Sequence, residues 1–151
     1  MHNASYHVIT RGIRRDNIFL SDNDFEKYLF YLWKYKTRFK ANIYAYCLMS
    51  NHVHLLIDPK TPMDMRRIMH GLNLSYSQYF NVKYRKCGHL WQNRYKSLIV
   101  QNDEYLLNVI SYIEYNPLRA KICTRAEDYP WSSYKPRVIG GHNKILDSFK
   151  Y

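Results

Sequence analysis

The sequence predicts an α+β domain in which helices pack on a central antiparallel sheet. Short apolar segments of strand length alternate with longer segments that have helical spacing, and two of the strand-like segments are close enough to pair as a hairpin. The resulting order is strand–helix–strand–strand–helix–strand–helix. This order is typical of the ferredoxin-like or RNA-recognition-like group of folds.

The first strand and the first helix have clear local signals. Residues 6–12 (YHVITRG) form the predicted strand. Ser21, followed three residues later by Asp24, predicts a capping box at a helix start. Apolar and aromatic residues then recur at helical spacing, so we expect a helix over about 22–38.

The remaining elements follow the same logic. Thr61 with a proline next to it predicts a second helix start, and Gly71 is expected to weaken that helix in its middle. In order, we expect a hairpin of strands over 42–49 and 51–58, a helix over about 62–84, an extended segment over 89–100, and a helix that begins at Asn102 or Asp103 and ends at Pro117. We expect one domain over residues 1–136 and a weakly patterned tail over 137–151, for which disorder is an open alternative.

Composition points to a polyanionic partner. The 151 residues include 23 Lys and Arg against 12 Asp and Glu, a formal net charge of +11. A small domain with this charge typically binds nucleic acid, and an anionic membrane surface is the second candidate. No apolar run approaches the ~20 residues that span a bilayer, and no signal peptide is recognisable, so we expect no membrane role. The three widely spaced cysteines favour a reduced, cytoplasmic protein.

The second strand of the hairpin carries two histidines among apolar residues. CLMSNHVHLLID covers residues 47–58, and strand alternation places His52, His54 and Leu56 on one face. Two imidazoles that leave one face side by side can bind a metal ion. Because the chain has seven histidines, ordinary core or surface histidines remain an equally open interpretation.

The last helix, SYIEYNPLR (111–119), offers further candidate groups. Tyr112 and Asn116 are four residues apart and share a helix face. An amide oxygen suits Mg²⁺ or Mn²⁺, and a tyrosine beside such an ion is a candidate nucleophile. Alternatively, Tyr112 is an ordinary half-buried aromatic residue of the helix. Asn116 precedes Pro117, which disfavours helical geometry there, so the direction of its side chain is open. Glu114 lies about 160° around the helix from Asn116 and is expected to face solvent.

Four blocks of sequence give the most specific functional signal. They are AYCLMSNHVHLLI, GHLWQNRYKSLIV, YIEYNPLRA and EDYPWSSY, in that order, within about residues 6–136. Together they resemble the REP-associated tyrosine transposases, which belong to the single-tyrosine HUH transposases of small bacterial insertion sequences. The family fold, a central antiparallel sheet crossed by the catalytic helix, agrees with the predicted elements.

The resemblance implies a role for each candidate residue. His52 and His54 would be metal ligands with Asn116 as the third, Mg²⁺ or Mn²⁺ the cofactor, and Tyr112 the nucleophile. Tyr115 lies where the family commonly has an aliphatic residue. The implied activity is a metal-dependent single-stranded DNA endonuclease and strand transferase, which acts on palindromic or hairpin DNA through a 5′-phosphotyrosine intermediate.

The predicted DNA-binding residues combine cationic and aromatic side chains. Cations contact phosphates, and each unpaired base that stacks on an aromatic ring contributes ~1–3 kcal/mol. The residues are Arg11, Arg14, Arg15, Lys83, Arg85, Lys86, Trp91, Arg94, Tyr95 and Lys96. The alternative is a solvated basic segment with Trp91 in the core. If DNA binds, its affinity should fall steeply with salt.

Two other function classes stay open at this point. One is a non-catalytic or host-domesticated nucleic-acid-binding module on the same fold, which needs no metal. The other is a replication or conjugation relaxase, although such chains are usually larger. The oligomeric state is open as well: related insertion-sequence enzymes resemble swapped dimers, whereas REP-associated members resemble monomers, so the chain is expected to be a monomer or a homodimer.

Overall fold

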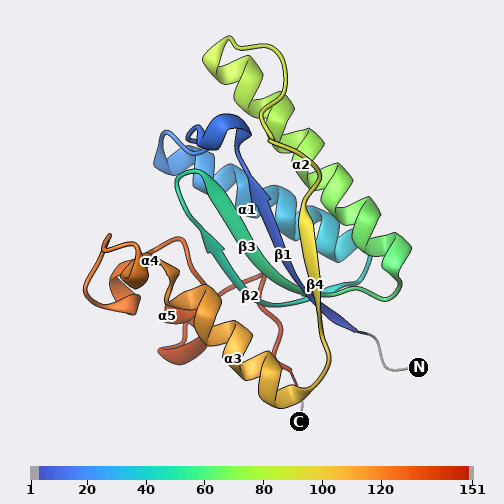
Figure 1. The fold of residues 1–151 in the computed structure, drawn as a ribbon, viewed down its shortest axis with the longest axis vertical. Coiled ribbons are helices and arrows are strands. Elements are labelled where there is room, and N and C mark those ends of the chain that lie inside the picture. The colour runs from blue at the N-terminus through green and yellow to red at the C-terminus, as the bar shows by residue number, and fades with distance from the viewer. Residues whose placement is uncertain (1–3, 150–151) are drawn as a thin grey trace.

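One antiparallel sheet organises the chain (Figure 1). The computed structural model describes residues 4–149. The strands are β1 (Ser5–Arg11), β2 (Asn42–Leu48), β3 (His52–Asp58) and β4 (Lys96–Val100), and the α-helices are α1 (Asp22–Arg38), α2 (Pro62–Tyr84), α3 (Asp103–Glu114), α4 (Asn116–Arg119) and α5 (Tyr134–Val138). Short 3₁₀ turns occupy Ile13–Arg15 and Ala126–Asp128. The four strands lie in the order β2-β3-β1-β4, which confirms the predicted fold class.

The two faces of the sheet carry different helices. Helices α1 and α2 cover one face and α3 covers the other (Figure 1). Leu55 of β3 belongs to the core under α1 and α2, whereas Leu56 belongs to the core that it shares with Ile110 of α3. Because side chains alternate along a strand, His52 and His54 share the α3 face with Leu56.

The helix starts form the caps that the sequence predicts. Ser21 and Asp24 make a reciprocal capping box at α1, and the Thr61 side chain accepts a backbone N–H in the first turn of α2. Gly71 does not interrupt α2. A Cβ atom there would lie 2.3 Å from a ring carbon of Tyr35, so the glycine lets α1 and α2 pack closely. Within residues 4–149, no helix is long and apolar enough to cross a membrane.

Strand β4 covers only the last part of the extended segment predicted over 89–100. Before it, Trp91 forms an isolated antiparallel bridge with Gly12, and the Gln92 N–H donates to the Arg11 carbonyl at 2.9 Å, so this part of the segment still pairs with the chain at the end of β1. The Trp91 ring packs near Tyr28 and Tyr76, and its indole N–H donates to the carbonyl of Asn73 of α2 at 3.0 Å. A space is left between this segment and α2, and it forms the cleft described below.

The C-terminal segment returns to the sheet. Ile145 is buried in the core under α1 and α2. The Asp147 carboxylate accepts the backbone N–H of Ile43 at 2.9 Å and pairs with the ammonium of Lys36. Residues 150 and 151 of the predicted tail lie outside the described residues, and the domain boundary at residue 136 stays a prediction.

Candidate active site

Four ring side chains meet where β1, β3 and α3 come together. The ring centroids of His52 and His54 are 5.0 Å apart. The Tyr112 ring centroid lies 6.0 Å from that of His54 and 5.9 Å from that of His7. We call His7, His52, His54 and Tyr112 the His–Tyr cluster. The structure thus brings together three of the predicted site residues and adds one that was not predicted.

His7 enters the cluster through the pairing of β1 with β3. In this antiparallel register Ile9 lies opposite His54, which leaves His7 diagonally adjacent on the same face. The His7 Nε2 and His54 Nδ1 atoms are 2.9 Å apart, within hydrogen-bond distance. His7 has no histidine two or four residues away along the chain, so its spacing gives no signal for a metal site. Only the register between distant strands reveals its position.

Helix α3 is held on the sheet by the residues on either side of Tyr112. Val109, Ile110 and Ile113 are buried in the core that contains Leu56 of β3. Tyr112 lies beside this apolar stripe, at the edge of the helix next to the histidines, and half of its side chain is exposed (50%). The nucleophile proposed from the sequence is therefore open to a ligand while its helix is fixed.

Among residues 4–149, hydrogen bonds engage one ring nitrogen of His52 and one of His54. His52 Nδ1 lies 2.6 Å from the side-chain oxygen of Asn51, an acceptor that favours the Nδ1–H tautomer. His54 Nδ1 is occupied by His7. The two Nε2 atoms thus remain as candidate lone-pair donors. Such outer hydrogen bonds are a regular feature of histidines that ligate metals.

Both histidines are neutral at physiological pH. Burial, with a smaller contribution from the charge of Arg11, lowers the pKa of His52 to about 4. Burial is also the main cause that lowers the pKa of His54 to about 3, and the neighbouring His52 adds to it. A metal ion binds the deprotonated imidazole, so neutral rings are the form that a metal site requires.

The predicted third ligand does not lie on the helix that carries Tyr112. Helix α3 ends at Glu114 and Asn116 begins α4, so Tyr112 and Asn116 lie on separate helices. Among residues 4–149, no three His, Cys, Asp or Glu side chains are grouped to hold one ion. Asn116 stays the predicted third ligand. The donor set of two imidazoles and an amide oxygen fits a divalent ion.

Arg119 is a second residue that sequence reasoning missed. Its guanidinium carbon lies 4.1 Å from the ring centroid of Tyr112, in cation–π geometry. It also donates a hydrogen bond to the backbone carbonyl of Tyr112. The turn between α3 and α4 produces this contact, because the chain folds back so that a residue seven positions later covers the tyrosine.

Glu114 does not face solvent, contrary to our expectation. Its side chain is fully buried and pairs with Arg137, whose Nε lies 2.9 Å from Oε1. The Ser133 hydroxyl donates to its other oxygen at 2.6 Å and accepts the backbone N–H of Tyr46. The reason for the difference is tertiary, because the segment around α5 covers the side of α3 that carries Glu114. These bonds tie α3 to β2.

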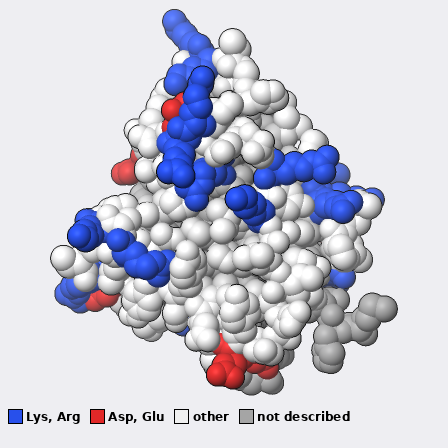
Figure 2. Space-filling model, in the orientation of Figure 1, with Lys and Arg blue, Asp and Glu red and all other residues white. Residues whose placement is uncertain are grey.

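The predicted DNA-binding cations lie in different surroundings. Arg11 is opposite His52 in the sheet and so borders the His–Tyr cluster, whereas Arg14 and Arg15 are exposed. Lys83 forms an ion pair with the buried Asp24 at 2.8 Å, so its charge is already compensated. Arg85, Lys86, Arg94 and Lys96 are exposed. Figure 2 shows Lys and Arg spread over the upper part of one face, where α2 lies, and again near α4.

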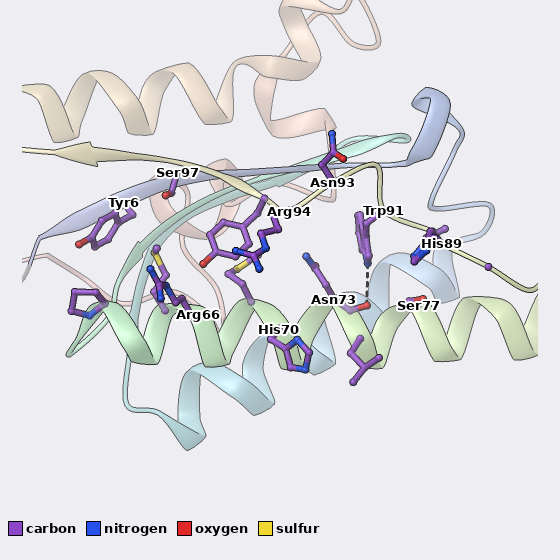
Figure 3. A pocket seen from close by; sticks show the side chains of 17 residues that line it. Tyr6, Arg66, His70, Asn73, Ser77, His89, Trp91, Asn93, Arg94 and Ser97 are labelled. Atoms are coloured by element: carbon purple, nitrogen blue, oxygen red, sulfur yellow. Dashed lines mark hydrogen bonds between the residues drawn. The ribbon is translucent and has the colours of Figure 1, made fainter.

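A cleft of about 840 Å³ separates α2 from the segment before β4 (Figure 3). Trp91 and Arg94 point into it from that segment and Asn73 points into it from α2. Tyr95 also lines the cleft. Three of the predicted DNA-binding residues therefore share one surface. The Trp91 ring is partly buried in the core as well, and a DNA-binding role for these residues stays a prediction.

Comparisons with known proteins indicate the family of the chain. The family model for IS200-like transposases matches residues 1–116. A Haemophilus influenzae protein assigned as a REP-associated tyrosine transposase is 29% identical over 101 residues, which is 60% of this chain and 57% of that protein. The chain thus spans little more than half of the curated relative.

Two solved structures have a similar fold. A REP-associated tyrosine transposase bound to a REP hairpin has a TM-score of 0.71 at 16% identity, and the match covers 99% of this chain and 88% of that one. A protein of Deinococcus radiodurans R1 assigned as a transposase has a TM-score of 0.53 at 19% identity, over 76% of this chain and 91% of that one. With the family model matching most of its length, the chain belongs to the IS200-like transposase family.

Proposed function

We propose that this chain is a metal-dependent endonuclease and strand transferase for single-stranded DNA, with Tyr112 as its nucleophile. One observation carries the proposal: an exposed tyrosine on α3 lies 6.0 Å, ring centroid to ring centroid, from a histidine of the HxH strand. The two segments are far apart in the sequence, and each belongs to a block that resembles the tyrosine transposases.

The metal would be held by the Nε2 atoms of His52 and His54 and by the amide oxygen of Asn116. Mg²⁺ or Mn²⁺ at this position would supply Lewis-acid polarisation of the scissile phosphate. The protein prepares the two imidazoles by holding them neutral and by engaging the other nitrogen of each ring.

Tyr112 carries out the covalent step. Its phenolic oxygen bonds to phosphorus as the bond from phosphorus to the 3′ oxygen breaks, and the phenolic proton passes to water. The products are a 5′-phosphotyrosine and a free 3′-OH. One phosphodiester has replaced another, so a second 3′-OH can attack the linkage and join strands without an external energy source.

Hairpin DNA is the substrate that the solved relative and the exposed cationic and aromatic side chains favour. The solved relative with the TM-score of 0.71 is bound to a REP hairpin. Exposed cations such as Arg14, Arg15 and Arg94 would contact phosphates, and Trp91 and Tyr95 in the cleft offer aromatic faces to unpaired bases. Binding of this kind weakens steeply as salt rises.

Metal removal tests the proposed activity. Purified protein incubated with a random library of hairpin-flanked single strands should form a covalent DNA adduct in Mg²⁺ or Mn²⁺, visible as a slower band on a denaturing gel. Addition of EDTA should reduce the adduct to background, because the scissile phosphate loses its electrophilic activation. An equal yield of adduct in EDTA would contradict a metal-dependent mechanism.

A non-catalytic DNA-binding module is the second candidate. The observation that favours it is that, among residues 4–149, no three His, Cys, Asp or Glu side chains are grouped to hold one ion. This candidate predicts that the same library binds tightly while no adduct forms with any divalent metal. The assay above therefore separates the two functions in a single experiment.

A further inference from the structure

We propose that Arg119 is a catalytic residue that positions the Tyr112 ring and binds a non-bridging oxygen of the scissile phosphodiester. The inference rests on the proposed function, since it concerns the same reaction. It assigns to α4, of which Arg119 is the last residue, a part in transition-state stabilisation. Neither the HxH strand nor the tyrosine itself supplies that contribution.

Two contacts fix Arg119 relative to the tyrosine. The guanidinium carbon is 4.1 Å from the Tyr112 ring centroid, so the cation lies over the ring face. One N–H donates to the Tyr112 backbone carbonyl, which lies in the last turn of α3 where carbonyls have no partner within the helix. Together the contacts hold the phenol ring and the guanidinium as a unit.

A helix cap alone does not account for this arrangement. A guanidinium has five N–H donors, and the carbonyl uses one of them. Arg119 is also exposed and, among the residues that the structure describes, has no carboxylate partner. Its neighbours in the C-terminal segment differ in this respect, because Arg125 pairs with Glu127 and Arg137 pairs with Glu114. Arg119 is thus a free cation beside the proposed nucleophile.

Arg119 is close enough to the proposed nucleophile to reach a phosphate that Tyr112 attacks, because its guanidinium carbon lies 4.1 Å from the phenol ring centroid. A phosphate attacked by Tyr112 must lie between the phenol and the histidines. Arg119 contacts the phenol, and its planar fork suits two oxygens of one phosphate.

Arg119 forms no covalent bond in the proposed reaction. While the bond from Tyr112 to phosphorus forms and the bond to the 3′ oxygen breaks, charge is spread over the non-bridging oxygens. Guanidinium N–H groups already placed at those oxygens stabilise the charge without reorganisation. The arginine neither gains nor loses a proton in the step.

The first part of the test measures the rate of adduct formation. The substrate is the oligonucleotide that the wild-type protein cleaves most from the random hairpin library. Arg119→Gln should slow adduct formation about 10²–10³-fold, the loss typical of one transition-state donor. Arg119→Lys should recover part of the rate, since it restores the charge without the fork. Arg125→Gln, in the same segment but paired with Glu127, is the matched control and should match wild type.

The second part measures binding in EDTA with the nucleophile removed. In the Tyr112→Phe background, the protein should prefer the oligonucleotide with a normal scissile phosphodiester over one with a neutral methylphosphonate there by about tenfold. Adding Arg119→Gln should abolish this preference. A merely structural cap would lower overall affinity or thermal stability equally for both oligonucleotides.

The outcomes separate the two proposals. If wild type forms the adduct but Arg119→Gln keeps both the rate and the phosphate preference, Arg119 has no catalytic role and the proposed function stands. If wild type forms no adduct, the proposed function fails, and the role of Arg119 in that reaction fails with it. Should Arg119→Gln fold poorly by circular dichroism, Arg119→Lys decides, because unchanged rate and preference in that variant overturn the inference.

Discussion

Tyr112→Phe should abolish the covalent DNA adduct while leaving hairpin affinity within about twofold of wild type. The substitution removes only the phenolic oxygen, which is the atom that bonds to phosphorus. Half of the Tyr112 side chain is exposed and its hydroxyl makes no hydrogen bond among residues 4–149, so the loss should not disturb the fold. The measurement is the yield of slower-migrating adduct on a denaturing gel, beside a binding titration with the same oligonucleotide.

Tyr115→Phe is the control for this experiment. Tyr115 belongs to the same sequence block and is also exposed, but its ring lies 5.8 Å from that of Tyr134 rather than beside the histidines. It should form the adduct at the wild-type rate. Loss of the adduct in Tyr115→Phe together with its survival in Tyr112→Phe would transfer the nucleophilic role to Tyr115.

Arg137→Met should lower the free energy of unfolding by about 2–3 kcal/mol. Removal of one partner of a buried ion pair leaves the other charge uncompensated, at a cost of about 3–5 kcal/mol when both are buried. Glu114 is fully buried, but the Arg137 side chain is 36% exposed, so the expected loss of stability is smaller than for a fully buried pair. Urea unfolding followed by circular dichroism gives the difference.

Two comparisons make the stability prediction specific. Arg125→Met removes an exposed ion pair with Glu127 and should change the free energy of unfolding by less than about 0.5 kcal/mol. Glu114→Gln combined with Arg137→Met should recover part of the loss, because the buried charge is gone. If Arg137→Met is no more destabilising than Arg125→Met, the buried pair does not anchor α3.

Local signals predicted the fold well. The capping box at Ser21 and the apolar stripe after it led to a helix over 22–38, and α1 spans Asp22–Arg38. Strand alternation alone placed His52 and His54 on one face, because the period of two is independent of what packs on the strand. These features depend on residues close together in the sequence.

Features set by tertiary packing were beyond the sequence. His7 reaches His54 only through the pairing of β1 with β3, and Glu114 is buried only because a segment about twenty residues later covers it. Arg119 reaches Tyr112 because the chain reverses after α3. Each contact joins residues from separate elements, for which helical or strand periodicity carries no information.

The adjacency of Tyr112 and His54 within one polypeptide has a genetic consequence. One variant can lack the Tyr112 phenol and another can lack the two imidazoles. Neither variant then has a complete site within its own chain, so mixing the two proteins should not restore DNA cleavage. An enzyme that borrows its helix from a neighbour would regain one active centre in each mixed dimer. We therefore expect a chain to cleave DNA only if it carries both the tyrosine and the histidines itself.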